Sequence, residues 1–551
     1  MPDNRPPCLE TIHCGVVSAE AIVIGAGHNG LVAAAYLARA GLRTLVLERR
    51  HLVGGACVTE ELWPGFRVSR AAYVAGLLRP AVVRELGLEA RGLRLIPRNP
   101  SSFTPLPADR GLLLGPDLAR SCDEIRRFSS RDAARYPAYE SLLDRTARAL
   151  EPLLDVAPPD PSRIRARDLL PLLRAGARGL RIGRDLSRAI ALLLGPARPT
   201  LEMFFESEPL RSTLATDAVI GAWASPSSPG TGYVLFHHVM GETHGARGVW
   251  AYVEGGMGGL SAALARAATD AGAQIRCEAP VRSIRLEAGR ATGVVLEDGS
   301  EIAADLVISN ADPQRTLLGL VGREAIPDDV ARGLEALDFR SPSLKINLAL
   351  GRLPRFPGRT PEAPDPPRPG PEHAGTIHAG AADLDALERC FEEAQAGHLP
   401  ERPMIELTLP SALDRTLAPE GCYVASLFVQ PVPFAVAGGW DVARDVFADR
   451  VLRLLDEVAP GFSESVLQRE VLAPPDLERI FALTGGNIFH GAMSLDRLLF
   501  MRPLPGWTGY RTPVPGLWLC GAGTHPGGGV MGACGRNAAG EILRERGLKR
   551  R

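Results

Sequence analysis

The chain has 551 residues, which is enough for two or three domains with sizeable hydrophobic cores. Its formal net charge of −1 argues against nucleic acid as the main partner, because nucleic-acid-binding proteins carry a strongly basic face. No run of about 18 apolar residues occurs, so we expect no membrane span. The nine cysteines are scattered without CxxC spacing, which predicts neither a zinc site nor a dithiol motif and fits a reducing compartment.

The first elements of the chain follow the order strand, glycine turn, helix, strand. The apolar run at 21–24 predicts a buried strand, and RTLVLE at 43–48 predicts a second one. Between them, GLVAAAYLARAG predicts an alanine-rich helix that ends at Gly41. The segment before them, 1–18, has no apolar run and few basic side chains, so it resembles neither a signal peptide nor a transit peptide.

The glycine turn has the spacing Gly25-x-Gly27-x-x-Gly30. In a dinucleotide-binding unit, the first glycine permits a tight turn, the second lets the backbone approach a pyrophosphate, and the third lets the helix pack on the strand. The pyrophosphate then binds N–H groups at the helix N-terminus. Glu48 ends the second strand eighteen residues after Gly30, where an acidic residue binds the adenosine ribose. This arrangement favours a dinucleotide site over a plain glycine turn between core elements.

The residues after Glu48 bear on which dinucleotide is bound. Glu48 disfavours the 2′-phosphate of NADP but is compatible with NAD and with FAD. The pair Gly54-Gly55 lets the chain pass close to a longer cofactor and favours FAD, although a simple β-turn also explains it. Disulfide reductases have a second cysteine five residues after the first, and Leu62 stands there after Cys57. We therefore interpret Cys57 as a small packed residue.

The rest of the chain indicates two domains. Residues 120–245 are expected to be mostly helical, with one amphipathic stretch at 133–154, and 275–309 to form short strands. Residues 353–374 are a proline-rich exposed loop, and the C-terminal segment is a strand, a glycine-rich turn and a helix. We predict an α/β fold in which a discontinuous Rossmann-like FAD-binding domain carries an inserted α+β substrate domain. The expected ranges are 18–120, 250–335 and 480–551 for the first domain, and 121–249 and 336–479 for the second.

Several long motifs resemble those of one family. They include GAGHNGLVAAAYL, LERRHLVGGACVTEE, YVEGGMGGL, GGNIFHGAMSLD and GAGTHPGGGVMGACGRNAA. On these motifs, nearly the whole chain resembles the pyridine nucleotide-disulfide oxidoreductase domain-containing protein 2 group, within the phytoene desaturase-like flavoproteins. The resemblance implies FAD, a fold shared with carotenoid desaturases and amine oxidases, and an oxidoreductase activity.

The resemblance also carries expectations about location and partners. Animal members of the group are associated with mitochondria and are thought to act there through a component of the respiratory chain. The N-terminus of this chain departs from that pattern because it lacks a transit peptide. We therefore expect a cytoplasmic protein if the source is bacterial, and a mitochondrial matrix protein if it is a eukaryotic member.

The resemblance also assigns residues to the FAD site. The glycine turn would hold the pyrophosphate, Glu48 the ribose, Gly54-Gly55 would line the cofactor, and Val281 would offer its backbone to adenine. The C-terminal segment would cross the phosphates and the flavin ring, with a helix N-terminus that favours negative charge on the reduced ring. The full expected set is Val23, Ile24, Gly25, Ala26, Gly27, His28, Asn29, Gly30, Glu48, Arg49, Gly54, Gly55, Ala56, Val281, Gly521, Gly523 and Met531.

Histidines are the candidates for acid–base chemistry. His525 lies beside the expected flavin segment, where it is either a proton donor or flavin contact, or a residue that holds a glycine-rich turn. His237, His238 and His490 are further candidates, although we favour a structural role for each. They have no carboxylate at metal-ligand spacing, so we predict no metal site.

Two further segments allow two interpretations each. EGGMGGL at 254–260 either binds a second nucleotide such as NAD or brings its backbone close to the flavin, and we favour the second. Residues 163–194 carry eight arginines against two aspartates, interleaved with leucine. They either dock on a membrane surface to collect a lipid, or form a solvated helix face whose leucines lie in the core, and we favour the second.

The leading functional hypothesis is an FAD-dependent oxidoreductase that moves a hydride and a proton at a C–C bond of an apolar substrate. The substrate would lie in a tunnel between the two domains. A different class of hypothesis is a protein-interaction regulator of mitochondrial or respiratory function, with vestigial activity. Amine oxidation and non-redox isomerisation stay open within the enzyme class. A long apolar tunnel would indicate a lipid or isoprenoid, and a short aromatic cage an amine.

Overall fold

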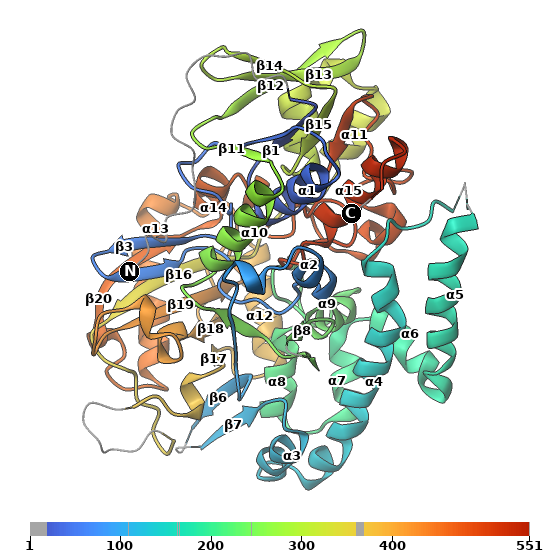
Figure 1. The fold of residues 1–551 in the computed structure, drawn as a ribbon. Helices are drawn as coiled ribbons and strands as arrows, with labels where there is room; N and C mark the ends of the chain where they lie inside the picture. The colour runs from blue at the N-terminus through green and yellow to red at the C-terminus, as the bar shows by residue number, and fades with distance from the viewer. Residues whose placement is uncertain are drawn as a thin grey trace.

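A computed structural model of the chain describes residues 19–107, 110–161, 164, 166–243, 245–359 and 368–549 (Figure 1). The N-terminal segment 1–18, in which we found no targeting pattern, lies outside this part, as do residues 360–367 of the proline-rich loop. Within the described residues, no helix combines the length and the apolar character needed to cross a bilayer.

A five-stranded sheet in the order β11-β2-β1-β15-β21 forms the centre of the first domain, and all of its paired strands run parallel. Its strands are β1 (Ala21–Ile24), β2 (Thr44–Leu47), β11 (Gln274–Arg276), β15 (Leu306–Ser309) and β21 (Leu517–Leu519). Helices cover both faces of such a sheet, so its strands are apolar throughout. Every residue of β1, β2 and β15 is accordingly buried. The discontinuous sheet that the sequence predicted is confirmed.

Three helices of small residues cover this part of the molecule: α1 (His28–Arg39) contacts β1 and β2, α10 (Gly258–Asp270) contacts β11, and α15 (Ala533–Glu545) contacts α1. A Cβ on Gly535 of α15 would lie 2.1 Å from the carbonyl oxygen of Asn29, so α15 touches the start of α1 through backbone. A small antiparallel sheet of β12 (Val281–Glu287), β13 (Arg290–Leu296) and β14 (Glu301–Ala303) completes the strand series expected at 275–309.

A seven-stranded sheet in the order β20-β16-β19-β18-β17-β6-β7 forms the second domain. Its strands are β6 (Ser102–Leu106), β7 (Arg110–Leu114), β16 (Leu344–Leu350), β17 (Thr376–Gly380), β18 (Met404–Thr408), β19 (Tyr423–Gln430) and β20 (Val466–Leu472), with α12 (Leu384–Gln395) and α13 (Trp440–Asp456) beside it. The expected domain boundary at residue 120 is therefore too late. The hairpin of β6 and β7 belongs to the second sheet, because β6 pairs with β17, a strand from a distant part of the sequence.

Residues 118–239 are mostly helical, as expected. The helices are α3 (Leu118–Arg126), α4 (Ser130–Leu154), α5 (Ala166–Leu180), α6 (Leu186–Leu194), α7 (Ala197–Phe204), α8 (Glu208–Thr216) and α9 (Thr231–Val239). The amphipathic stretch at 133–154 lies within α4. The interpretation that the leucines of 163–194 lie in the core is wrong for most of them, since Leu173 and Leu180 are 67% and 79% exposed.

Shorter elements join these parts. They are α2 (Pro80–Glu85), α11 (Asp328–Glu335), α14 (Pro474–Phe481), β3 (Thr59–Trp63), β4 (Phe66–Ser69), β5 (Leu95–Pro97), β8 (Glu242–Thr243), β9 (Ala246–Arg247) and β10 (Ala251–Val253). The C-terminal segment runs from β21 through a glycine-rich turn into α15, as the sequence indicated.

Candidate active site

The glycine turn between β1 and α1 is tightly packed. Gly25 has a φ of +91°, which favours glycine, and a Cβ on Gly30 would lie 2.2 Å from the carbonyl oxygen of Gly25. A Cβ on Gly27 would lie 2.6 Å from Nδ2 of Asn310. No side chain caps the N-terminus of α1. The turn therefore leaves helix N–H groups and bare backbone for a phosphate, as the spacing predicted.

Glu48 and the pair Gly54-Gly55 hold this turn from the other side. The Glu48 carboxylate accepts the Ala26 N–H at 2.8 Å and the Arg50 N–H at 3.0 Å. Gly54 donates its N–H to the Ala26 carbonyl at 2.9 Å, and a Cβ on Gly55 would lie 3.4 Å from Cα of Gly27. Gly54-Gly55 thus packs directly on the turn at 25–30. A simple β-turn, the alternative explanation of the pair, would not need this contact.

These residues border a cavity of about 450 Å³, which we call the nucleotide cavity. Eleven of the expected cofactor residues line it: Ile24, Gly25, Gly27, His28, Asn29, Glu48, Arg49, Gly54, Gly55, Ala56 and Val281. The other six do not line it: Val23, Ala26, Gly30, Gly521, Gly523 and Met531.

The six exceptions have plain physical reasons, and for Gly523 the reason is close packing, since a Cβ there would lie 2.5 Å from Cδ of Pro313. Val23 is an interior strand residue, and Ala26 and Gly30 are closed in by the turn itself. A Cβ on Gly521 would lie 2.5 Å from the Asn310 carbonyl oxygen, and Met531 packs in the core of the helical part. Their neighbours Ala522, Gly529 and Val530 line the cavity instead, so the C-terminal segment is at the site but the expected residues are displaced.

Sequence reasoning missed much of the far wall of this cavity. Asn310, Ala311 and Arg315 follow β15, and Lys345, Phe481 and His490 come from three more segments. Asn310 had a signal that could have been used. It stands at the carboxyl end of a strand adjacent to β1, and ligands of open parallel sheets bind at that edge.

His525 is not part of the site. Its side chain is buried and lines neither large cavity. Nε2 lies 2.8 Å from the Leu153 carbonyl oxygen, which only accepts, so Nε2 carries the proton. Burial lowers the pKa of His525 to about 4, and the ring is neutral. The catalytic assignment of His525 is therefore wrong, and its role is to tie the glycine-rich turn to the end of α4.

The other histidines either make structural contacts in the core or line one of the two cavities. Nε2 of His237 lies 3.1 Å from the Gly528 carbonyl oxygen in the core, which is a structural contact. His238 lines the second cavity, where its ring stacks on Trp250 at 5.8 Å between centroids. His490 lines the nucleotide cavity beside His28. Burial lowers the pKa of both His28 and His490 to about 4, and each has a buried ring nitrogen without a partner.

Cys57 and the loop at 254–260 both serve packing. Cys57 is fully buried, and burial raises the pKa of its thiol to about 12, which disfavours the thiolate needed for redox chemistry. Residues 254–260 do not line the nucleotide cavity, so our favoured interpretation of them is wrong. A Cβ on Gly256 would lie 2.3 Å from Oγ1 of Thr59, so this loop packs on β3 instead.

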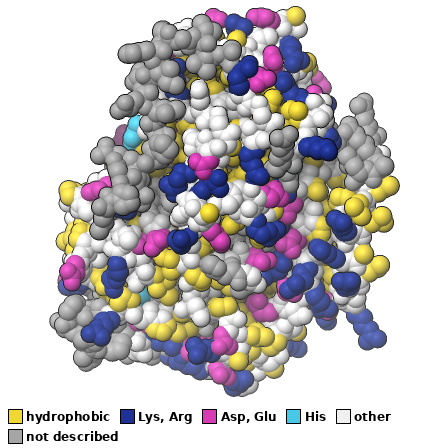
Figure 2. Space-filling view, viewed as in Figure 1, with side chains coloured by type: hydrophobic (Ala, Val, Ile, Leu, Met, Phe, Trp, Pro, Cys, Tyr) yellow, Lys and Arg dark blue, Asp and Glu magenta, His cyan; other side chains and the backbone are white. Residues whose placement is uncertain are grey.

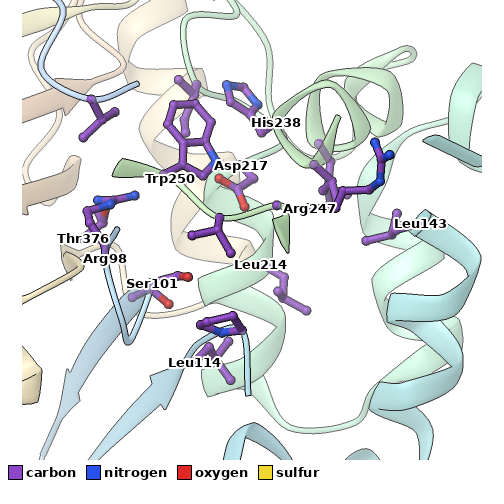
Figure 3. A pocket seen from close by; sticks show the side chains of 18 of the residues that line it. Arg98, Ser101, Leu114, Leu143, Leu214, Asp217, His238, Arg247, Trp250 and Thr376 are labelled. Carbon is purple, nitrogen blue, oxygen red and sulfur yellow. The ribbon is translucent and has the colours of Figure 1, made fainter. Parts of the chain in front are cut away.

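A second cavity, of about 720 Å³, adjoins the first, and we call it the substrate cavity. Figure 3 shows Arg98 and Thr376 on one side of it and Leu143 of α4 on the other, with Asp217 and Trp250 between them. Seven residues line both cavities: Ala72, Tyr73, Phe428, Ile488, Phe489, Gly529 and Val530. A group in the nucleotide cavity can therefore meet one in the substrate cavity at this junction.

A buried charged cluster lies at the junction. Tyr73 donates its hydroxyl to Oε2 of Glu406 at 2.9 Å, and Glu406 is 3% exposed. Burial, with the nearby Asp217, raises the pKa of Glu406 to about 7. On the nucleotide side, burial lowers the pKa of Lys345 to about 7, and its Nζ lies 4.3 Å from the centroid of the Tyr73 ring.

Arg98 is a cation on the substrate side of this cluster. It is 4% exposed and donates Nη1–H to Oγ1 of Thr376 at 2.8 Å, while its Nε has no partner. Its charge lowers the pKa of Glu406, against the larger effect of burial, and also that of His378, whose Nδ1 lies 3.9 Å from Oε1 of Glu406. Among the described residues, no group of three or more His, Cys, Asp or Glu is arranged to hold a metal ion.

Comparison with known proteins identifies the family. Residues 23–80 match the NAD(P)-binding Rossmann-like domain, and residues 116–361 match the flavin containing amine oxidoreductase family. The mouse pyridine nucleotide-disulfide oxidoreductase domain-containing protein 2 is 50% identical over 548 residues, covering 96% of this chain and 93% of its own. The chain belongs to the pyridine nucleotide-disulfide oxidoreductase domain-containing protein 2 family.

Two further comparisons bear on the reaction class and on the fold. A limonene dehydrogenase polypeptide of Castellaniella defragrans is 30% identical over 97% of this chain and 96% of its own. A solved structure of a putrescine oxidase variant, 16% identical, covers 96% of this chain and 99% of its own with a TM-score of 0.60, which shows the shared fold. The family member is thus a flavin oxidoreductase of the phytoene desaturase-like type.

The nucleotide cavity fits a flavin cofactor on its own geometry. The bare turn at Gly27 and the free N-terminus of α1 suit a phosphate, and Glu48 is placed to meet a ribose. The buried, unpartnered ring nitrogens of His28 and His490 leave hydrogen-bonding capacity toward the same cavity.

Proposed function

We propose that the protein is an FAD-dependent dehydrogenase that introduces a C=C bond into an apolar substrate. The observation that carries this proposal is the junction of the two cavities at Tyr73 and Phe428, with a proton-accepting group beside it. FAD rather than FMN is supported by Glu48, because only a dinucleotide carries an adenosine ribose to reach it. Bound FAD would supply the two-electron acceptor for the hydride.

Apolar side chains of the substrate cavity hold and dehydrate the substrate. Leu77, Leu143, Leu235 and Ile488 line it together with the rings of Trp250 and Phe428. Removal of water strengthens the electrostatic interactions at the junction and protects the reacting carbon atoms from side reactions. The relative named limonene dehydrogenase supports an apolar substrate by analogy.

Glu406 would accept the proton. Desaturation removes a hydride from one carbon and a proton from its neighbour, so a base is needed at the second carbon. Oε2 of Glu406 is fixed by Tyr73, and the Glu406 side chain lines the substrate cavity. With a pKa of about 7, Glu406 is a stronger base than an ordinary carboxylate, and it is partly ionised at neutral pH.

Amine oxidation is the second candidate, and the cavity gives it a specific basis. The half-buried carboxylate of Asp217 and the buried one of Glu406 line the cavity with the indole of Trp250, a combination that can hold an ammonium group. Arg98 in the same cluster opposes a cation and favours the first proposal.

Anaerobic mixing of the FAD-loaded protein with limonene, phytoene and putrescine in turn tests the proposal. We expect loss of the oxidised flavin absorbance with a hydrocarbon and no change with putrescine. Bleaching by putrescine alone would establish the amine oxidase instead. Purified protein that takes up no FAD, or whose flavin no hydrocarbon bleaches, would contradict the proposal.

A further inference from the structure

The hairpin of α5 and α6 carries an unusual concentration of exposed apolar side chains. Nine of the 19 large hydrophobic side chains that are exposed among the described residues lie between residues 164 and 194. Figure 1 shows these helices at the outer edge of the helical part, and Figure 2 shows yellow and dark blue side chains together along that edge. We call residues 169–194 the hairpin surface.

The orientation of α5 explains the exposure. Its half-buried residues are Pro171, Ala175 and Gly179, and their spacing of four places them on one side of the helix. Since α5 contacts α4, this side of small residues is the packed one. Leu173 and Leu180 project from the opposite side, 67% and 79% exposed. The helix thus turns its small residues inward and its leucines outward, the reverse of an ordinary surface helix.

The second helix repeats the pattern. Leu186, Ile190 and Leu194 recur every four residues of α6 and are 41%, 48% and 57% exposed. Ala189 and Leu192, on the other side, are buried in the helical core. Both helices of the hairpin therefore present an apolar stripe to the outside.

Positive charge accompanies these stripes. Between residues 169 and 194 the chain has five arginines, Arg174, Arg178, Arg181, Arg184 and Arg188, and one acidic residue, Asp185. All five arginines are exposed, and Asp185 is already bound by Arg145 and Arg188 at 2.6 and 2.9 Å. Long arginine side chains can keep their charge at a polar interface while leucines enter an apolar phase.

We propose that the hairpin surface docks on the anionic surface of a lipid bilayer. Apolar stripes flanked by arginine are what an interfacial helix uses, with the stripe in the acyl boundary and the charges at the headgroups. Charge complementarity selects this occupant. If a second copy of the chain docked here, the five arginines of each copy would repel those of the other. Anionic headgroups instead attract each arginine.

The docking surface has a direct structural connection to the substrate cavity. α4 contacts α5, and from the same helix Tyr139, Glu140 and Leu143 line the cavity. One helix therefore separates the bilayer from the cavity. On the proposed function, an apolar substrate dissolved in the bilayer would need to pass only this helix, although docking itself does not depend on the reaction.

Sedimentation of the FAD-loaded full-length protein with lipid vesicles tests the proposal. One set of vesicles is phosphatidylcholine alone, and in the other about a third of the lipid is phosphatidylglycerol. We expect binding to the anionic set that weakens with salt. The double variant Leu173→Gln, Leu180→Gln should bind more than about tenfold more weakly, because two leucines lose their apolar contact. The double variant Arg174→Glu, Arg181→Glu reverses two charges and should weaken vesicle binding by about the same factor.

Matched controls come from α13, where Val442 and Val446 are 70% and 61% exposed and Arg453 is exposed. Val442→Gln with Val446→Gln, and Arg453→Glu, should leave vesicle binding unchanged. Flavin content and Tm check that each variant is folded. Wild-type protein that stays in the supernatant with both vesicle sets overturns the proposal. A leucine variant that binds vesicles like the wild type also overturns it. The same holds for a leucine variant whose only change is from a dimer to a monomer.

Discussion

The two cavities are built in different ways. The nucleotide cavity uses backbone: bare glycines, a helix N-terminus and a carboxylate that is held by two amide N–H groups. The substrate cavity uses side chains, and its charged cluster joins Tyr73 to Glu406, two residues far apart in the sequence. A backbone site specifies the cofactor and tolerates little change, whereas a side-chain site can be altered one residue at a time. The chemistry that distinguishes this protein should therefore depend on the second cavity.

The largest effect should come from Glu406→Gln. The variant keeps the size and the hydrogen bond from Tyr73 but removes the base, so flavin reduction by a bleaching hydrocarbon should slow roughly 100- to 10,000-fold. Stopped-flow absorbance measures the rate, and the flavin content should be unchanged. Glu464→Gln, on an exposed carboxylate, is the control. An unchanged rate in the Glu406 variant would remove the proton acceptor from the mechanism.

Gly27→Leu should impair the nucleotide cavity and leave the substrate cavity unchanged. The added side chain meets Nδ2 of Asn310 and the path of the phosphate, so FAD affinity should fall by roughly 10- to 100-fold. Isothermal titration of the apoprotein with FAD measures this. Gly319→Ala, where a Cβ meets nothing within 4 Å, should bind FAD normally. Retained affinity in the leucine variant would show that the turn does not approach the cofactor.

Tyr73→Phe should shift a pH profile rather than abolish the reaction. Glu406 must be ionised to act, so flavin reduction should rise as pH increases through about 7. The hydrogen bond from Tyr73 lowers the pKa of Glu406, so its loss should move this rise to higher pH, with less than about a tenfold drop in the limiting rate. Rate measurements across the pH range test this. A profile that moves to lower pH would be inconsistent with the assigned contact.

The smallest effect should come from His525→Leu. The Leu153 carbonyl loses its donor, so the protein should be destabilised by about 1 kcal/mol, with the rate of flavin reduction unchanged. Thermal unfolding and the stopped-flow assay separate the two quantities. His525→Gln, which retains an N–H donor, should recover part of the stability. A slowed reaction with normal stability would restore His525 as a catalytic candidate.

The sequence predicted what is encoded locally. The turn Gly25–Gly30, Glu48 and Gly54-Gly55 lie in one short stretch of the chain, and their geometric roles follow from spacing alone. The sequence could not reveal that β6 pairs with β17, nor that Glu406 meets Tyr73, because such contacts depend on tertiary packing of distant segments. His525 shows the same limit in reverse. Its neighbours Ala522 and Gly529 line the nucleotide cavity, but its side chain turns to α4.

The contact of α15 with α1 has a consequence for synthesis of the chain. Most of α1 is buried, and part of its cover is α15, which lies at the opposite end of the sequence. Until β21 has left the ribosome, the N-terminal sheet lacks one edge strand, and until α15 has followed, α1 exposes an apolar side. Large proteins with such exposed surface are prone to aggregate during folding. Helix α1 is thus made well before the helix that covers it, and nascent chains should depend on chaperones during the interval between the two.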